Sequence, residues 1–544
     1  MPHTVDVPKQ KNLSEFFTQQ QDLHRDYVAF ENMGVTLTYR EMQEHSDAFA
    51  AYLQHLGLRT GDRIAIQLPN ILQFPVAFVG AIKASLIVVP TNPLYTPREM
   101  EHQFNDSGVT AIVILSNFAH NLEKIIGKTS IKHVIVTRIG DMLGVLKGTL
   151  VNFIIKNVKK SEPAYSLPGC LSFRHALRTW KQLKQITLHA SLDNVAVLQY
   201  TGGTTGLSKG AQLSHGNILY HASQIFTWLQ PGLLGNHRDI IICPLPLYHI
   251  YALGLALMVG YQLGCKIVLI TNPRDISAFV KELRKHKLSV FAGVNTLFNA
   301  LLNHPRINDV DFSNLRVVGA GAMALQDSVA QRWKELTGVA ILQGYGLSEN
   351  SGALSSNPVS GKNKNDTVGL PIPSTELGVF DESGKSLMQG EIGEICARGP
   401  QVMRGYWNMD NKDVFFDDGW FRTGDMGSMD EDGYFRIVDR KKDMINVSGL
   451  KVFPNEIENV LAGHPKILEC AALGFPDPQC GEVVKLFVVK KDPSLTEDEV
   501  MNFCRENFVK FKVPKRIEFI DAIPKTPVGK ILRRTLRETE KQVT

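Results

Sequence analysis

The chain has 544 residues, which is too long for a single hydrophobic core and predicts several domain-sized units. Apolar residues make up 44% and charged residues 21%, and the net charge of +5 is too small to indicate a nucleic-acid-binding protein. The seven cysteines are scattered without a Cys-x-x-Cys pair, which fits a reducing compartment and argues against a disulfide framework or a zinc site. Residues 1–17 lack the apolar core of a secretory signal. We therefore expect a cytoplasmic protein without a nucleic-acid partner.

Apolar strand-like runs alternate with helical patterns over most of the chain. Strands are predicted at 63–68, 109–115 and 266–270, and helices at 98–105 and 276–286. This alternation is typical of an α/β fold whose sheets are buried. We therefore expect the α/β fold class.

The pattern changes near residue 439. A turn signal at 430–433 and a strand at 434–438 are followed by the charged run Asp439-Arg440-Lys441-Lys442-Asp443. A new unit is predicted beyond it, with a helix at 454–462, a strand at 483–489 and a helix at 496–507. We therefore expect a large N-terminal domain over 1–438 and a small C-terminal domain over 439–544.

A glycine-rich loop after the strand-like run 195–200 carries the strongest local signal. Glycines let the backbone approach a ligand, and successive N–H groups can form an anion-binding nest. Hydroxyls and a lysine add donors that suit a polyphosphate, and a polar loop without a ligand is the alternative. The spacing differs from a Walker A motif, because Lys209 lies between Ser208 and Gly210. The candidate phosphate-binding residues are Thr201, Gly202, Gly203, Thr204, Thr205, Gly206, Ser208 and Lys209.

Two segments offer surfaces for a base and a cation. Tyr345 lies between Gly344 and Gly346, so it presents a flat aromatic face beside flexible backbone. Glu349 offers carboxylate oxygens for Mg²⁺, which normally bridges carboxylates and substrate phosphates. Small residues at Gly319-Ala320 would let backbone approach a planar ligand. Alone, the glycine segment is explained at least as well by an ordinary strand-to-helix turn. Without its surrounding motif, Glu349 would be better explained as a solvated surface acid.

Two charged residues offer further contacts. Asp425 can accept hydrogen bonds from both hydroxyls of a ribose, and such charge-assisted bonds are the stronger class. Lys530 follows Gly529 in a loop bounded by proline and glycine. For an isolated lysine in this basic C-terminal region, a solubilising tail is the alternative.

Taken together and in order, these motifs resemble the adenylate-forming superfamily, which includes acyl-CoA synthetases, peptide-synthetase adenylation domains and firefly luciferase. The resemblance covers nearly the whole chain and is closest to bacterial long-chain fatty-acid–CoA ligases. The segments that carry this closer resemblance are Asn92-Pro93-Leu94-Tyr95-Thr96-Pro97-Arg98-Glu99, Pro246-Leu247-Tyr248-His249-Ile250, Gly293-Val294-Asn295-Thr296-Leu297-Phe298 and 438–445.

The resemblance implies a large N-terminal domain of stacked α/β subdomains with a β-barrel-like part, and a small mobile α+β C-terminal domain. It also implies a two-step reaction. A fatty carboxylate attacks the α-phosphate of ATP and releases pyrophosphate, and the CoA thiol then attacks the acyl-adenylate. ATP and CoA are therefore expected as co-substrates, and Mg²⁺ as a cofactor.

The resemblance implies a role for each candidate residue. Thr204 in the glycine loop, Glu349 as the Mg²⁺ ligand and Lys530 are expected to be catalytic, with Lys530 bridging the carboxylate and the α-phosphate. The hinge is expected at Asp439. The C-terminal domain would rotate about this residue, so that Gly449 replaces Lys530 at the active site for the second step. The resemblance also implies the contacts with ATP and AMP. Gly319 and Ala320 are expected to lie along adenine, and Tyr345, with Gly344 and Gly346 beside it, is expected to stack on adenine. Ser348 is expected to contact phosphate, Asp425 to bind the ribose, and Arg440 to lie near the ribose and phosphate.

Two positions depart from the usual family pattern. The family usually has Thr at the position of Ser348, and the hydroxyl is kept. Phe421-Arg422 replaces the commoner Leu-His, and this change leaves Asp425 untouched.

The acyl chain requires an apolar tunnel. Candidate lining residues are Tyr248, Tyr251, Val294 and Phe298, and for each of them plain core packing is an equally good interpretation. Long chains can be favoured by depth alone, because each buried methylene contributes about 0.8 kcal/mol.

The segment from Leu146 to Lys160 bears on location. At helical spacing Leu146, Leu150, Phe153, Ile154 and Val158 share a face, and four lysines lie mostly off that face. This pattern is consistent with a helix on an anionic membrane surface, and a core helix with solvated lysines is the alternative. We expect peripheral contact with membrane lipid at the inner face of the cytoplasmic membrane.

Several alternatives remain open at this point. The chain could load a separate carrier protein instead of CoA, or act on aryl or medium-chain acids. A luciferase-type oxidative enzyme would share all the adenylation motifs. A nucleotide-binding, membrane-associated interaction protein without chemistry is the non-enzymatic alternative. A homodimer is a further expectation.

Overall fold

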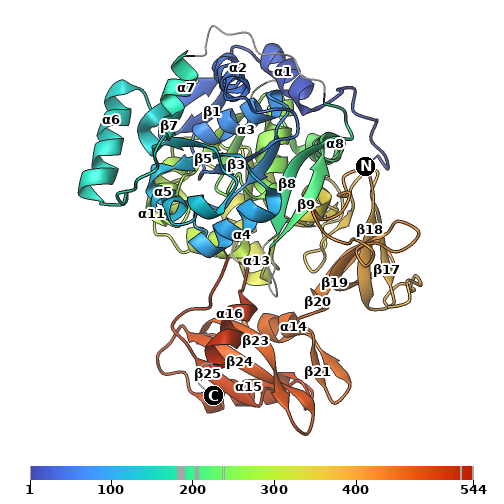
Figure 1. Cartoon of the computed structure of the whole chain (residues 1–544). Helices are drawn as coiled ribbons and strands as arrows, with labels where there is room; N and C mark the ends of the chain where they lie inside the picture. The colour runs from blue at the N-terminus through green and yellow to red at the C-terminus, as the bar shows by residue number, and fades with distance from the viewer. Residues whose placement is uncertain are drawn as a thin grey trace.

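The computed structural model describes residues 2–179, 190–201, 208–235, 237, 239–526 and 530–541. A predominantly parallel sheet forms the first layer of the N-terminal domain (Figure 1). Its strands lie in the order β7 (Leu171–Ser172), β6 (His133–Thr137), β5 (Ala111–Leu115), β3 (Arg63–Gln67), β4 (Ile87–Pro90), β8 (Val195–Thr201) and β9 (Lys209–Ser214). Only the β8–β9 pair in this order is antiparallel, among the strands that the structure describes.

A second sheet packs against the same hydrophobic core. Its central strands are parallel, so they are joined by crossover helices that cover the sheet. The strand order is β16 (Leu370–Pro371), β15 (Ser355–Ser356), β14 (Ile341–Tyr345), β13 (Val317–Ala320), β12 (Val290–Gly293), β10 (Ile240–Cys243), β11 (Lys266–Leu269), β1 (Val28–Asn32) and β2 (Val35–Thr38).

Helix α3 (Gln73–Lys83) shows how the core is built. Every residue of this helix is buried, and its apolar side chains belong to the core cluster shared with both sheets. A helix that is apolar on all sides is stable only when it is enclosed by protein in this way. The buried ammonium of Lys83 is satisfied by Gln21 Oε1 at 2.7 Å and by the carboxylate of Asp47.

Predicted helices match observed ones with shifted ends. The helix expected at 98–105 is α4 (Pro97–Ser107), where Thr96 and Glu99 form a reciprocal capping box. The helix expected at 276–286 is α11 (Ile276–Leu283). It ends early because the N–H groups of Lys285 and His286 bond carbonyls three residues back instead of four.

An antiparallel sheet comes next in the chain and is the part that the resemblance described as barrel-like. It has the order β17 (Glu376–Phe380), β18 (Gly393–Arg398), β19 (Phe421–Met429) and β20 (Phe435–Arg440). The expected hinge residue, Asp439, lies in β20 and pairs with Met426 of β19. The charged run after it therefore begins inside a strand.

The C-terminal domain is a smaller α+β unit set apart from the rest in Figure 1. It has hydrophobic clusters of its own. Its elements are β21 (Ile445–Val447), β22 (Leu450–Val452), α14 (Pro454–Leu461), β23 (Ile467–Asp477), β24 (Gly481–Lys490), α15 (Glu497–Asn507), β25 (Arg516–Phe519) and α16 (Arg533–Lys541). The predicted α/β class, with a large N-terminal and a small C-terminal domain, is confirmed.

Within the described ranges, no helix combines the length and the apolar composition that a bilayer span requires.

Candidate active site

One large cavity lies between the two domains and has a volume of about 2220 Å³. Its walls come from strand ends of both N-terminal sheets, from β19 and β20, and from the C-terminal domain. In open α/β sheets, ligands bind at such strand ends. The cavity therefore lies where the fold class would place a nucleotide.

The two strands that flank the glycine-rich loop in the sequence reach the wall of this cavity. β8 and β9 form an antiparallel pair in which Thr201 lies opposite Lys209 and Tyr200 opposite Gly210. Thr201, Ser208 and Lys209 line the cavity, and the Lys209 ammonium lies 5.1 Å from the centre of the Tyr406 ring. Of the predicted phosphate-binding residues, Gly202, Gly203, Thr204, Thr205 and Gly206 lie outside the described residues.

The segment after β14 brings a base-sized surface to the cavity. Gly344, Tyr345, Gly346 and Ser348 all line it, together with Gly319 and Ala320 at the end of β13. Gly346 is required by packing, because a Cβ there would lie 1.7 Å from the carbonyl oxygen of Gly352. No side chain fits at that distance, so the backbone of this turn is held against its neighbour.

Glu349 lies in the short turn Ser348–Asn350 and is positioned by two hydrogen bonds. The Tyr406 hydroxyl donates to Glu349 Oε1 at 2.7 Å, and the Met403 amide donates to the Glu349 carbonyl at 2.7 Å. Burial, followed by the charge of Glu349, raises the pKa of Tyr406 above its ordinary value, so the phenol stays protonated and keeps donating. The carboxylate therefore faces the cavity in a fixed orientation.

Asp425 is the centre of a buried polar group on β19 and β20. The Arg440 guanidinium Nε lies 2.6 Å from Asp425 Oδ1, and the Tyr345 hydroxyl donates to Asp425 Oδ2 at 2.6 Å. Asp425 and Arg440 are cross-strand partners, so the register of the sheet sets this pair. Burial and the nearby Asp425 charge raise the pKa of Tyr345 well above its ordinary value.

Lys530 reaches the same cavity from the C-terminal domain. Its loop is closed by hydrogen bonds in both directions with Thr526: the Lys530 amide donates to Thr526 Oγ1 at 3.0 Å, and the Thr526 amide donates to the Lys530 carbonyl at 2.8 Å. Burial and the positive charge of Arg440 lower the pKa of Lys530, whereas the carboxylates of Asp425 and Glu349 act in the opposite direction. Residues far apart in sequence are thus brought together around one site.

One part of the cavity is lined by a face of α8 (His215–Leu229), and we call this part the α8 branch. His221, Ile225, Trp228 and Leu229 recur at helical spacing and all line it, and Leu255 adds to the wall. His221 accepts a hydrogen bond from the Ala353 amide at 2.9 Å, and burial lowers its pKa to about 3. The imidazole is therefore neutral, and this branch carries no charge from the helix.

The predicted acyl-binding residues are divided between the cavity and the core. Tyr248 and Tyr251 line the cavity. Val294 and Phe298 are buried and are not among the lining residues. The Phe298 ring packs edge-on against Phe291 and Trp333, with centroids 5.5 Å and 4.9 Å away.

Asp439 and Gly449 occupy different environments. Asp439 is buried, and its carboxylate accepts hydrogen bonds from the amides of Arg440 at 2.7 Å and Asn455 at 2.8 Å. Burial raises its pKa to about 6. Gly449 lies in the exposed turn between β21 and β22 with φ of +84°, and it is not among the cavity-lining residues. In this conformation Lys530 is at the cavity and Gly449 is away from it.

Some cavity residues were not singled out from the sequence. His249 lines the cavity, and burial together with the Lys530 charge lowers its pKa to about 3. His249 lies within the segment 246–250 that carries part of the family resemblance, and that motif is the signal that could have identified it. Tyr406 and Lys442 also line the cavity. Nothing in the residue pattern links Tyr406 to Glu349, because they meet only through the fold.

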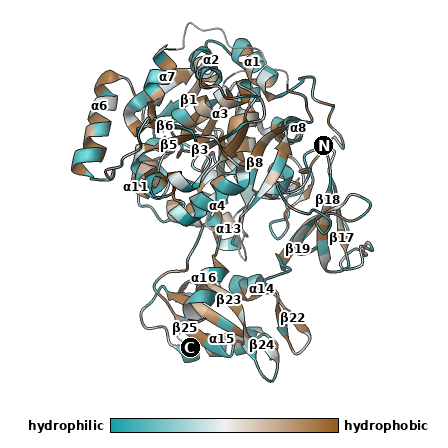
Figure 2. Ribbon diagram, in the orientation of Figure 1, coloured by the Kyte–Doolittle hydropathy of each residue, from teal (hydrophilic) through white to brown (hydrophobic). Residues whose placement is uncertain are grey.

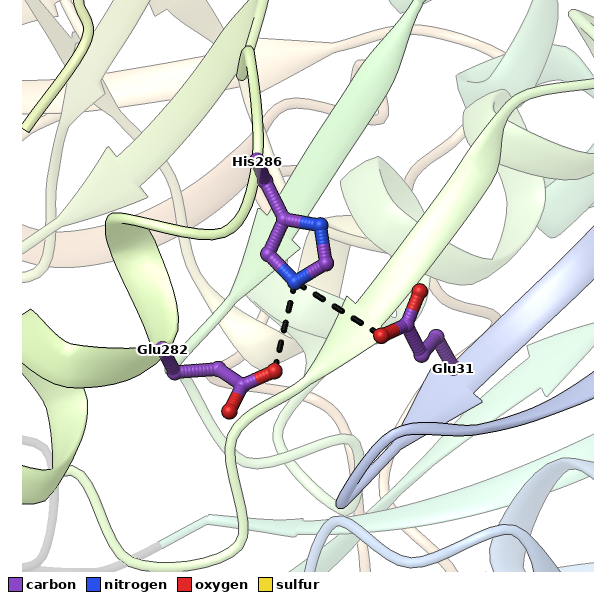
Figure 3. A group of neighbouring side chains, drawn as sticks. All are labelled: Glu31, Glu282 and His286. Carbon is purple, nitrogen blue, oxygen red and sulfur yellow. Dashed lines mark hydrogen bonds and ion pairs between the residues drawn. The ribbon is translucent and has the colours of Figure 1, made fainter.

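Away from the cavity, Glu31, Glu282 and His286 form a separate group (Figure 3). His286 Nε2 lies 3.2 Å from Glu282 Oε1 and 3.7 Å from Glu31 Oε1. The hydrogen bond from His286 is the main cause that lowers the pKa of Glu282 to about 2. Each carboxylate also pairs with a lysine, Glu31 with Lys266 and Glu282 with Lys285. The group is therefore an ion-pair network that ties β1 and β11 to the end of α11.

Comparison with known proteins agrees with the geometry. The model of the AMP-binding enzyme family matches residues 17–407, and the model of the AMP-binding enzyme C-terminal domain matches residues 456–530. A long-chain-fatty-acid–CoA ligase of Escherichia coli O157:H7 is 50% identical, with 99% of this chain and 96% of that protein covered. A long-chain-fatty-acid–CoA ligase of Bacillus subtilis strain 168 is 36% identical, with coverage of 99% and 96%.

Among solved structures, an anthranilate CoA ligase in complex with anthranoyl-AMP superposes with a TM-score of 0.86 at 26% identity, covering 99% of both chains. The resemblance inferred from the motifs is thus confirmed over the whole chain. On these grounds, the chain belongs to the AMP-binding enzyme family.

Proposed function

We propose that this chain is a ligase that joins a long-chain fatty acid to CoA through an acyl-adenylate, with ATP converted to AMP and pyrophosphate. The observation that carries the proposal is a single cavity with two kinds of wall. Glu349, Asp425, Arg440 and Lys530 surround its polar end, and an apolar face of α8 lines another branch. The names of relatives about half identical over nearly their full length support the same activity.

In the first step, a carboxylate oxygen of the fatty acid attacks the α-phosphorus of ATP. A new acyl–O–P bond forms, and the bond to the pyrophosphate oxygen breaks. Carboxylate and phosphate repel each other, so the main requirement is a fixed cation that offsets this repulsion and the charge that develops in the transition state. Lys530 takes that role, and the ammonium of Lys209 acts on the polyphosphate.

Asp425 and Tyr345 orient the nucleoside. The Asp425 carboxylate accepts hydrogen bonds from the ribose hydroxyls, and the Tyr345 ring stacks on adenine between Gly344 and Gly346. Gly319, Ala320 and Ser348 complete the adenine and phosphate contacts. Arg440 pairs with the Asp425 carboxylate and keeps it in a fixed orientation.

The donor set at Glu349 fits Mg²⁺. A carboxylate held by Tyr406 faces a cavity that also presents the hydroxyl-bearing residues Thr201, Ser208 and Ser348, and such oxygen ligands are those that Mg²⁺ shares with substrate phosphates. When bound there with ATP, the ion would neutralise phosphate charge. The protein's own contribution is to hold Glu349 in a fixed orientation.

In the second step, the CoA thiol attacks the acyl carbonyl carbon, a thioester forms, and AMP leaves. We propose that the C-terminal domain, from about residue 439 onward, turns about Asp439 so that the Gly449 turn replaces Lys530. The Asp439 carboxylate accepts a hydrogen bond from the amide of Asn455, near the N-terminus of α14. The hinge therefore directly contacts the domain that would move.

The fatty acyl chain lies along the α8 branch, past Tyr248 and Tyr251 and toward Ile225 and Trp228. Because each buried methylene contributes about 0.8 kcal/mol, burial along this wall favours long chains. Such a substrate partitions into lipid, so we place the enzyme in the cytoplasm at the inner face of the cytoplasmic membrane.

A thioester assay with purified protein, ATP and CoA tests the proposal across acids from acetate to oleate, with benzoate and coumarate included. We expect rates that rise toward long-chain acids. Faster turnover of benzoate or coumarate would favour the aryl alternative. Transfer only to acyl carrier protein would favour the carrier-loading alternative, and absence of ATP–pyrophosphate exchange would favour the non-enzymatic one.

A further inference from the structure

Helix α6 (Val145–Phe153) and the turn that follows it, Ile154–Val158, stand at the periphery of the N-terminal domain (Figure 1). The helix is attached to the turn 139–142 through very close backbone contact. A Cβ on Gly148 would lie 2.2 Å from the carbonyl oxygen of Gly140, and a Cβ on Gly140 would lie 2.3 Å from that of Gly148. Only glycine fits at both positions, so this contact fixes which side of the helix faces the protein.

The side that faces the protein is partly polar. Asn152 Oδ1 accepts the Gly140 amide at 2.8 Å, and Asn152 Nδ2 donates to Asp141 Oδ1 at 3.2 Å. Val151 is the apolar residue of the helix that packs against the core. Small and polar groups therefore carry much of the attachment, where a surface helix ordinarily places its apolar residues.

The opposite side is apolar and exposed. Leu146, Leu150 and Phe153, spaced four and three residues apart, retain 89%, 58% and 57% of their accessible surface. Val145 and Val158 are also exposed, at 68% and 66%. Figure 2 shows α6 with brown, hydrophobic segments at the edge of the molecule. The alternative of a core helix with solvated lysines is wrong, because the leucines face solvent. Contiguous exposed apolar surface of this kind marks an interaction site.

The charge of the same segment identifies the partner. Lys147, Lys156, Lys159 and Lys160 are exposed, and the sequence 142–161 contains no aspartate or glutamate. Lys147 donates to the carbonyl of Met33, which brings the exposed Met33 in the β1–β2 turn beside the helix. A second copy of this chain would set lysines against lysines. An anionic lipid surface complements both the apolar face and the cations.

We propose that α6 and the turn 154–158 are a lipid-binding element that inserts Leu146, Leu150 and Phe153 into the interface of an anionic bilayer. This inference rests on the proposed function, because a fatty-acid substrate partitions into the same bilayer. The element lies in the plane of the interface, with its lysines at the phosphate level. It anchors the enzyme where its substrate is concentrated and leaves the catalytic cavity unchanged.

Flotation of the full chain with vesicles tests the proposal. The vesicles are phosphatidylcholine alone or phosphatidylcholine with phosphatidylglycerol. We expect the unaltered protein to float with the anionic vesicles. The triple variant Leu146→Gln, Leu150→Gln, Phe153→Gln should lose about tenfold or more of this binding, because three apolar anchors are removed. The variant Lys156→Gln, Lys159→Gln, Lys160→Gln should lose the preference for anionic lipid by a similar factor.

The matched control is Val7→Gln, Leu23→Gln, Met388→Gln, which removes three equally exposed apolar side chains elsewhere. It should bind vesicles like the unaltered protein. AMP release with hexanoate and CoA in vesicle-free buffer should be the same in all four proteins, which separates membrane binding from the ligase activity. Equal vesicle binding by the Leu146→Gln, Leu150→Gln, Phe153→Gln variant of α6 and by the control would overturn the proposal. So would absence of binding by the unaltered protein, or a dimer in solution that only the α6 variant dissociates.

Discussion

The two sides of the active site are held in different ways. Asp425 lies on β19, is paired in register with Arg440 on β20, and is bonded by Tyr345 from a third strand. Lys530 lies in the C-terminal domain and exchanges two hydrogen bonds with Thr526 of that domain. The Asp425 side, where we propose that the nucleotide binds, is thus fixed by strand pairing, whereas the position of Lys530 depends on that of a whole domain. This difference suits an enzyme that needs the lysine for only one of two steps.

The largest effect is expected at Asp425, on the side of the site that strand pairing holds in place. Asp425→Asn keeps the shape of the side chain but removes the charge that pairs with Arg440 and accepts the ribose hydroxyls. Because hydrogen bonds to charged groups contribute about 1.5–3 kcal/mol each, we expect the KM for ATP to rise by about 100-fold. Steady-state kinetics measure it, and thermal unfolding checks that the variant is folded. An unchanged KM for ATP would contradict the assignment of Asp425.

The hinge offers the next largest effect. Proline fixes φ near −65° and removes the amide donor, so Asp439→Pro restricts rotation at this position. We expect pyrophosphate release to remain within about twofold, and thioester formation to slow by roughly tenfold or more. Single-turnover assays of the two half-reactions measure this separately.

Asp439→Ala is the control for the hinge variant. It removes the carboxylate that accepts a hydrogen bond from the Asn455 amide, but it does not fix φ at residue 439. It should slow thioester formation less than the proline variant does. Equal loss of both half-reactions in Asp439→Pro would count against rotation at this residue.

A smaller effect is expected in the acyl branch. Ile225→Phe adds volume to the face of α8 that lines the cavity, so the longest acyl chains should lose contact first. Since one methylene is worth about 0.8 kcal/mol, each carbon displaced should lower kcat/KM by about fourfold, and shorter acids should be affected little. Chain-length profiles check this. A uniform loss for all acids would indicate a folding defect instead.

The smallest effect is a shift in pH dependence. The role proposed for Lys530 requires its ammonium form, so adenylation should fall as pH rises through the lowered pKa of Lys530. The charge of Lys442 contributes to that lowering. In Lys442→Gln the pKa of Lys530 should rise, and the alkaline limb of the pyrophosphate-exchange profile should move to higher pH. Lys441→Gln, which removes an ammonium that pairs with Glu382 and Glu394, should leave the limb in place.

The sequence predicted the fold class and most of the polar site, because the loop and turn motifs are local. Thr201, Lys209, Glu349, Asp425 and Lys530 each stand in a short motif whose chemistry can be argued from neighbouring residues. The structure brings all of them to one cavity. The strand pairing that sets Arg440 beside Asp425 follows from register, which the residue pattern did not specify.

Contacts between distant segments could not be predicted. Tyr406 meets Glu349 only through tertiary packing. The apolar residues of α8 are spaced as in any buried helix, so their spacing does not distinguish a cavity wall from the core. Phe298, which the sequence predicts to line the acyl tunnel, packs against Trp333. The orientation of α6 depends on the contact between Gly140 and Gly148, and helical periodicity alone does not reveal which face is inward.

We propose that Lys530 serves the first half-reaction and Gly449 the second. Both half-reactions should be measured side by side in Lys530→Ala and Gly449→Leu, as pyrophosphate exchange and as thioester formation from preformed acyl-adenylate. We predict that Lys530→Ala loses exchange by about 100-fold or more, the scale for removal of one electrostatic catalytic group, while its thioester formation is nearly unchanged. Gly449→Leu should show the opposite pattern. Equal losses of both half-reactions in both variants would contradict this division of roles between Lys530 and Gly449.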